Sequence, residues 1–234
     1  MNSHYLSRAT IELRGRESPR GSSRSYLLHQ AVADLIPDRS VRGYLFRETA
    51  TRSGVVDVLF LSDTPPRPVR EIPVRTWYRP ACVDTKPYSP RLRAGLVLDF
   101  EIRLNATRVV TDAAGRKQRH DIWNAIFRQN RFDERSPDDV YSDYLRRKFE
   151  GAASLLSAHV TERGEIQAMR GQPLRAIRFV ATNVIGTLEV TDGDRLRDLV
   201  VNGIGRARAF GCGLLCLSLP GTILPRRQTA GAPA

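Results

Sequence analysis

The chain has 234 residues, with 37 Lys and Arg against 25 Asp and Glu, which gives a net charge of +12 and an isoelectric point of about 10.4. This excess of positive charge indicates a polyanionic partner, and the length suits one large domain or two of about 100 residues each. No apolar stretch approaches the roughly 18 residues that cross a bilayer, and the N-terminus lacks the features of a signal peptide, so we expect a cytoplasmic protein with no membrane partner.

The first half of the chain predicts a mixture of strands and one helix. Ser25 is expected to cap this helix and Pro37 to end it. The stretch 62–94 is rich in proline and resists regular assignment over most of its length. The predicted elements are a strand at 5–13, a helix at 26–36, strands at 44–48 and 55–61, and a further strand at 72–78.

The second half begins with a long apolar strand and then becomes more polar. A basic segment follows the strand at 115–120, before two helical patterns. The predicted elements are a strand at 97–104, helices at 121–130 and 137–158, strands around 177–181 and 185–190, a short helix at 194–201, and a last strand at 214–219.

Both halves follow the order of strand, helix or helices, and further strands. This order favours an α+β protein made of tandem ferredoxin-like domains, the type found in RNA-recognition motifs. We assign an N-terminal domain to residues 1–94 and a C-terminal domain to 95–220. The tail 221–234, which is composed largely of small and polar residues, is expected to be disordered.

The glycine-rich segment 202–215 is the most informative part of the sequence. Glycine lets backbone N–H groups approach a ligand closely, and arginine recognises phosphate oxygens well. A dinucleotide-binding fingerprint is rejected, because a helical segment precedes the loop and too little chain follows it. A glycine-rich turn at a helix–strand corner is the alternative, and the two arginines favour an anion site. The predicted contacts are Gly203, Gly205, Arg206, Arg208, Gly211 and Gly213.

His29 is the histidine best placed for chemistry, because it falls at the edge of the apolar stripe of the helix 26–36. Tyr26 lies three residues earlier, on the neighbouring surface of the same helix. Such a histidine could transfer protons near neutral pH. A boundary histidine that is satisfied by one hydrogen bond is the simpler interpretation, and the residue pattern alone favours it.

No pattern in the sequence indicates a metal site. The chain lacks an H-E-x-x-H motif, a suitable carboxylate pair and a Cys/His set, and its three cysteines are scattered. We therefore expect no cofactor, and any catalysis is predicted to be independent of metal ions.

Basic side chains at Arg116, Lys117 and Arg119 are predicted to contact a nucleic-acid backbone. The positive run at 146–148 is better explained as a solvated helix face. The two tryptophans are far apart in the sequence, so base stacking on an aromatic platform is not evident. Recognition of duplex shape or phosphate is therefore favoured.

Several stretches of the chain, in order, resemble the CRISPR-associated repeat-processing endoribonucleases of the CasE type, which cut precursor CRISPR RNA in type I-E Cascade. The glycine-rich loop is the most specific of them. The matching stretches are 5–8, 26–30, 35–38, 44–47, 100–105, 186–190 and 203–215.

The resemblance implies a metal-free cut at the 3′ base of a repeat stem-loop, which leaves a 2′,3′-cyclic phosphate, and continued binding of the mature guide RNA beside other Cascade subunits. The tyrosine and histidine of the family's first helix fall on Tyr26 and His29. The resemblance therefore implies that His29 is catalytic and transfers a proton, and that Tyr26 orients or stabilises the scissile phosphate. Arg206 and Arg208 replace the family's usual proline and lysine, and 106–175 matches poorly. The alternatives are an RNA-hairpin-binding subunit that does not cleave, and a structural protein that meets phosphate nonspecifically.

Overall fold

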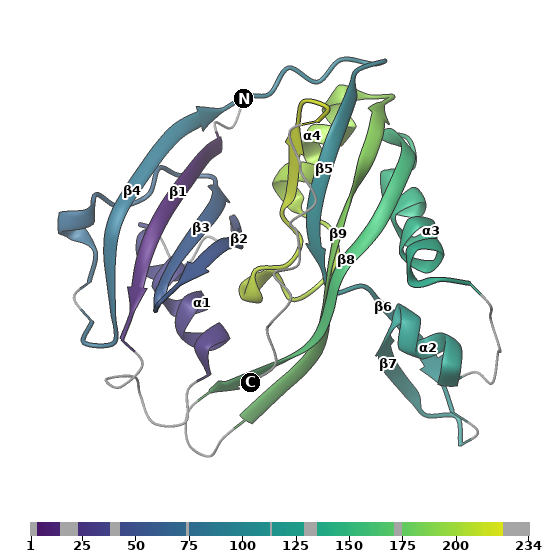
Figure 1. The fold of residues 1–234 in the computed structure, drawn as a ribbon, viewed down its shortest axis with the longest axis horizontal. Coiled ribbons are helices and arrows are strands. Elements are labelled where there is room, and N and C mark those ends of the chain that lie inside the picture. The colour runs from purple at the N-terminus through teal and green to yellow at the C-terminus, as the bar shows by residue number, and fades with distance from the viewer. Residues whose placement is uncertain are drawn as a thin grey trace, which may run out of the picture.

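The computed structural model contains two antiparallel sheets of four strands each, which face one another across the helix α1 and a C-terminal loop (Figure 1). Each sheet carries its own hydrophobic core. The structure describes residues 4–14, 23–37, 43–73, 75–112, 114–128, 135–170 and 175–221.

The first sheet has the strand order β2-β3-β1-β4, which is the order of a ferredoxin-like fold. Helix α1 covers it with the apolar face that contains Leu28, Val32 and Leu35. A short 3₁₀ helix stands where such folds usually place their second helix. The elements are β1 (His4–Leu13), α1 (Arg24–Leu35), β2 (Tyr44–Arg52), β3 (Val55–Ser62), η2 (Val69–Glu71) and β4 (Tyr78–Tyr88).

The second sheet has the equivalent order β10-β5-β9-β8, so the prediction of tandem ferredoxin-like α+β domains is confirmed. A two-stranded hairpin and a short helix are inserted after its first strand. The elements are β5 (Val97–Leu104), β6 (Thr107–Thr111), β7 (Lys117–Asp121), α2 (Ile122–Arg128), α3 (Pro137–Phe149), β8 (Ala153–Arg170), β9 (Arg175–Val190), α4 (Gly193–Asn202), η3 (Arg208–Phe210) and β10 (Leu215–Ser218).

Four sequence predictions about the elements were wrong. The runs around 177–181 and 185–190, expected as two strands, belong to the single strand β9. The N-cap of α1 is Ser23, whose side chain accepts a hydrogen bond from the Tyr26 amide. The strand expected at 72–78 is β4 at Tyr78–Tyr88, where an edge position tolerates proline because its outer side needs no ladder hydrogen bond. The helix expected at 137–158 ends at Phe149, and the chain turns at Gly151 with a positive φ before β8 begins.

Strands β8 and β9 form a long hairpin that reaches beyond its own sheet to α1 (Figure 1). The Met169 amide donates to Ser23 Oγ at 3.0 Å, and the Ser23 amide donates to the Met169 carbonyl at 3.5 Å. Ser23 therefore caps α1 and also attaches its N-terminus to the second sheet.

The two sheets are also joined by buried contacts from β2. Arg47 is almost completely buried and forms an ion pair with Glu101 on β5. Leu45 belongs to the core of the second sheet, although its strand belongs to the first.

The expected domain limit near residue 94 stays a prediction. The expected disordered tail lies, apart from residue 221, outside the described residues.

Candidate functional site

The N-terminal half of α1 presents Tyr26, His29 and Gln30 on one surface. The ring centroids of Tyr26 and His29 are 6.5 Å apart, so the structure brings these two predicted residues together. Gln30 Nε2 donates a hydrogen bond to Tyr26 Oη at 2.8 Å. The two side chains are one helical turn apart, and the hydrogen bond between them restricts the orientation of the Tyr26 phenol.

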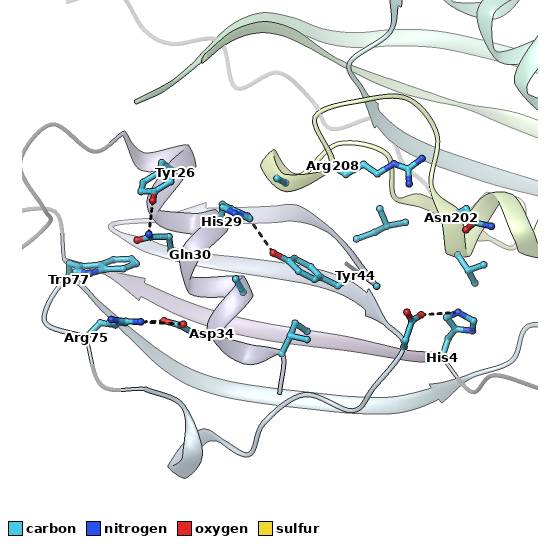
Figure 2. Close-up of a pocket in the computed structure, with 17 residues that line it drawn as sticks. His4, Tyr26, His29, Gln30, Asp34, Tyr44, Arg75, Trp77, Asn202 and Arg208 are labelled. Atoms are coloured by element: carbon cyan, nitrogen blue, oxygen red, sulfur yellow. Dashed lines mark hydrogen bonds and ion pairs between the residues drawn. The ribbon is translucent and has the colours of Figure 1, made fainter. Parts of the chain in front are cut away.

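His29 is held by aromatic side chains from outside its own helix. Tyr44 Oη on β2 lies 3.5 Å from His29 Nδ1, within hydrogen-bonding distance (Figure 2). The Phe210 ring of η3 lies 5.9 Å from the imidazole, between centroids, and in turn contacts Phe179 of β9 at 5.6 Å. The imidazole is thus packed at the junction of the two sheets, and this orientation depends on both.

Tyr26, His29, Gln30 and Tyr44 line a pocket of about 960 Å³ between α1, β2, the turn before β4 and the loop after α4. Figure 2 shows His29 on α1 and Arg208 on the loop, on facing sides of this space. His29, Tyr26 and Arg208 therefore share one cavity, although the arginine is almost 180 residues away in the sequence. The size is that of a typical small-molecule site.

The glycine-rich loop packs its backbone against β2. Its four glycines all have positive φ angles, which other residues rarely adopt. Gly211 and Gly213 are buried, and a Cβ at Gly211 would lie 3.3 Å from the Phe46 ring. The glycines therefore have a structural role in this packing, as the alternative of a glycine-rich turn at a helix–strand corner predicts. Direct RNA contacts from Gly203, Gly205, Gly211 and Gly213 stay predictions.

Replacing Gly203 with Ala is expected to destabilise this packing. The residue has φ +69°, and its Cβ would lie 2.8 Å from Leu45 Cδ1 and 3.0 Å from the Gly213 carbonyl oxygen. The Gly95→Ala variant is the control, because Gly95 has φ +82° and nothing within 4 Å of its Cβ position. We expect Gly203→Ala to lower the melting temperature by roughly 5 °C more than the control does. Equal melting temperatures would contradict the packing role.

Beside the pocket, on the C-terminal domain, lies a basic groove of about 470 Å³. It brings together cations from the β6–β7 hairpin, from α3 and from the glycine-rich loop. Tyr144 adds a hydroxyl that can donate a hydrogen bond to an anion, and burial raises the pKa of this hydroxyl. The side chains that line the groove include Arg119, Tyr144, Lys148, Arg206 and Arg208.

Arg208 lines both the groove and the pocket. Its Nη2 donates to the Gly203 carbonyl at 3.2 Å, at the C-terminus of α4. This bond fixes the arginine at the point where the two spaces meet.

The remaining predicted basic residues are less closely associated with the groove. Arg116 forms an ion pair with Asp112 in the β6–β7 turn, and Lys117 is exposed at the start of β7. Both lie on the hairpin that carries Arg119. Arg146 pairs with Asp143, as expected for a solvated face, but Lys148 does not follow that interpretation because it lines the groove.

Sequence reasoning missed Tyr44, Lys148, Phe210 and Arg75 as site residues. Tyr44 and Phe210 lie in stretches that resemble the family as a whole, and only their contacts with His29 in the structure distinguish them from their neighbours. Lys148 could have been suspected from its place at the end of a positive run. Arg75 lies in the proline-rich stretch, where nothing in the sequence indicates its pairing with Asp34.

Neither a membrane span nor a metal cluster is found in the described part of the chain. No helix there is long and apolar enough to cross a bilayer. Within the same residues, no group of three or more His, Cys, Asp and Glu side chains could hold a metal ion.

The fold and the site define a tandem ferredoxin-like protein in which a histidine pocket adjoins a basic groove. The family of CRISPR associated proteins matches residues 4–218. The chain therefore belongs to this family, among its CasE-type members.

Known proteins resemble the chain over most of their length. The Cascade subunit CasE of Escherichia coli strain K12 is 29% identical over 197 residues, which cover 82% of this chain and 91% of that protein. The crystal structure of Cas6e from Escherichia coli K-12 has a TM-score of 0.63 at 23% identity, over 92% and 99% of the two chains. Cse3 of Thermus thermophilus, bound to an RNA representing a pre-cleavage complex, has a TM-score of 0.63 at 20% identity, with the same coverage.

Proposed function

We propose that the protein is a metal-independent endoribonuclease that cleaves precursor CRISPR RNA at the 3′ base of the repeat stem-loop. The observation that carries this proposal is the position of Arg208, which lines the basic groove and also the pocket of His29. The groove suits the phosphates of the stem, and the pocket suits the phosphate at its base. Solved RNA complexes of the fold, such as that of Cse3, support the ligand class.

In the proposed reaction, the 2′-hydroxyl oxygen attacks the adjacent phosphorus and the bond from phosphorus to the 5′ oxygen breaks. A 2′,3′-cyclic phosphate forms, the 2′-hydroxyl proton is taken up by a base, and the leaving 5′ oxygen receives a proton. His29 provides one of these two proton transfers. Tyr26, whose ring centroid lies 6.5 Å from that of His29, orients the scissile phosphate. Arg208 stabilises the charge of this phosphate.

After the cut, the protein is proposed to remain on the mature guide RNA within Cascade. The relative CasE is named as a subunit of that complex. The groove supports retention, because cleavage at the base of the stem leaves the phosphates of the hairpin in place. We place this assembly in the cytoplasm, where precursor RNA is transcribed.

A hairpin with a single 2′-deoxy nucleotide on the 5′ side of the scissile phosphate tests the mechanism. The wild-type protein is expected to bind this RNA as tightly as the all-ribose hairpin but to leave it uncut, because the attacking hydroxyl is missing. The all-ribose product is expected to end in a cyclic phosphate. Cleavage of the deoxy substrate would refute the mechanism, and binding of both RNAs without any cut would indicate a non-cleaving RNA-hairpin-binding subunit.

A further inference from the structure

The pocket that holds His29 continues along α1 beyond the histidine. Asp34 lies five residues after His29, about 7.5 Å farther along the helix axis. Ala33, whose side chain is small, lines the pocket between them. The residues that α1 contributes to the pocket share one face of the helix, and they are Tyr26, His29, Gln30, Ala33 and Asp34; Ile36, just after the helix, also lines it.

An anchored arginine stands at this far part of the pocket (Figure 2). Arg75 Nε donates to Asp34 Oδ2 at 3.1 Å, and Arg75 Nη2 lies 3.5 Å from Asp34 Oδ1. Tyr78 Oη also donates to Asp34 Oδ2, at 2.7 Å. The carboxylate is 1% exposed, whereas the arginine side chain is 41% exposed. The buried carboxylate thus holds the guanidinium at the wall of an open space.

This arrangement suits a phosphate ligand. A guanidinium has five N–H donors in a rigid fork, and Asp34 occupies two of them. The remaining donors belong to a side chain that is already held in place, so less conformational entropy is lost when an anion binds. Gln30 and Trp77 complete this part of the lining and offer an amide and an indole beside the cation.

The position of Arg75 relative to the groove indicates which phosphate of the RNA it would bind. The groove with Arg119 and Lys148 is on the other side of Arg208 from the pocket, and under the proposed function it holds the stem. When the scissile phosphate lies at His29, the strand that follows the cut must leave the stem. The pocket along α1 is the space that continues from that point.

We propose that this part of the pocket is a subsite for single-stranded RNA on the 3′ side of the cut, with Arg75 binding the phosphate that follows the scissile one. The inference rests on the proposed function and extends it, because it assigns a contact to RNA that the mature product no longer contains. Such a contact favours precursor RNA over product without holding the mature hairpin.

The test compares two RNAs in a His29→Ala background, in which neither is cut. One hairpin ends at the cleavage position, and the other carries three further nucleotides. Binding is measured over a range of salt concentrations. We expect Arg75→Gln to weaken binding of the extended RNA about tenfold and to lower its salt slope by about 0.7, and to leave the short hairpin unaffected. The glutamine keeps an N–H donor for Asp34, and thermal unfolding verifies that the variant is folded.

Two controls separate the contact from other effects. Arg70→Gln removes the same charge from an exposed residue outside both cavities and is expected to change neither affinity. In the single variant, the Asp34 carboxylate loses its cationic partner. The double variant Asp34→Asn/Arg75→Gln removes this carboxylate charge as well. We expect the double variant to remain weak on the extended RNA.

Recovery of affinity in the double variant would overturn the inference, because the loss would then come from repulsion by Asp34. Equal loss on both RNAs, or no loss on either, would overturn it as well. Failure of the parent protein to bind either hairpin would instead refute the proposed function, and with it the basis of the inference.

Discussion

Replacing His29 with Ala is expected to slow cleavage of the repeat hairpin by at least about 100-fold, because one of the two proton transfers loses its catalyst. Binding of the hairpin should change little, since the residues that line the groove do not include His29. The measurement is a single-turnover cleavage rate with the hairpin bound to saturation. This condition separates the chemical step from binding.

Two further variants test whether the loss is specific to the site. His159→Ala removes an exposed histidine on β8 that pairs with Asp138, and it should cleave at the wild-type rate. Tyr44→Phe removes the hydroxyl that lies 3.5 Å from His29 Nδ1 and should give a smaller loss than His29→Ala, because the imidazole remains packed against Phe210. An unchanged rate in His29→Ala would refute its catalytic role.

Replacing Arg206 and Arg208 together with Ala is expected to weaken hairpin binding by about tenfold or more at physiological salt. Each phosphate contact that is lost should lower the slope of log affinity against log salt by roughly one. Both arginines line the groove, and Arg208 is the one that also reaches the pocket. The double variant should therefore also cleave more slowly when the RNA is saturating.

The matched control is Arg195→Ala/Arg197→Ala. These arginines lie on α4, pair with Asp192 and Asp194, and line neither cavity. Their removal lowers the net charge by the same amount, so it measures the effect of overall charge alone. If both double variants weaken binding equally, the glycine-rich loop has no specific role in holding RNA.

Much of the fold could be predicted, because its elements have strong local patterns. The apolar face of α1, the alternation in β1 and the short helix before the glycine-rich loop all lie close to their predicted places. The end of α3 was misplaced because Leu155 and its neighbours continue an apolar periodicity, although Gly151, just past the helix, is a local stop signal. Pairing of β8 with β9 decides this segment, and that contact is long-range in the structure.

The candidate site was predictable only in part, for a similar reason. Tyr26 and His29 could be placed together because three residues separate them on one helix. Lys148 and Arg119 meet in the groove only because α3 and the β6–β7 hairpin are folded together. The pair of Arg75 and Asp34 likewise depends on a turn that returns to α1, which no short-range rule predicts.

The central claim is that the pocket at the junction of the two sheets cuts RNA without a metal ion. It is tested most directly by incubating a labelled repeat hairpin in EDTA with the wild type and with His29→Ala, side by side. We predict a single cut at the 3′ base of the stem, made by the wild type alone. The claim would be contradicted if the wild type cut the RNA only after Mg²⁺ was restored. Equal cutting by the wild type and His29→Ala would also contradict it.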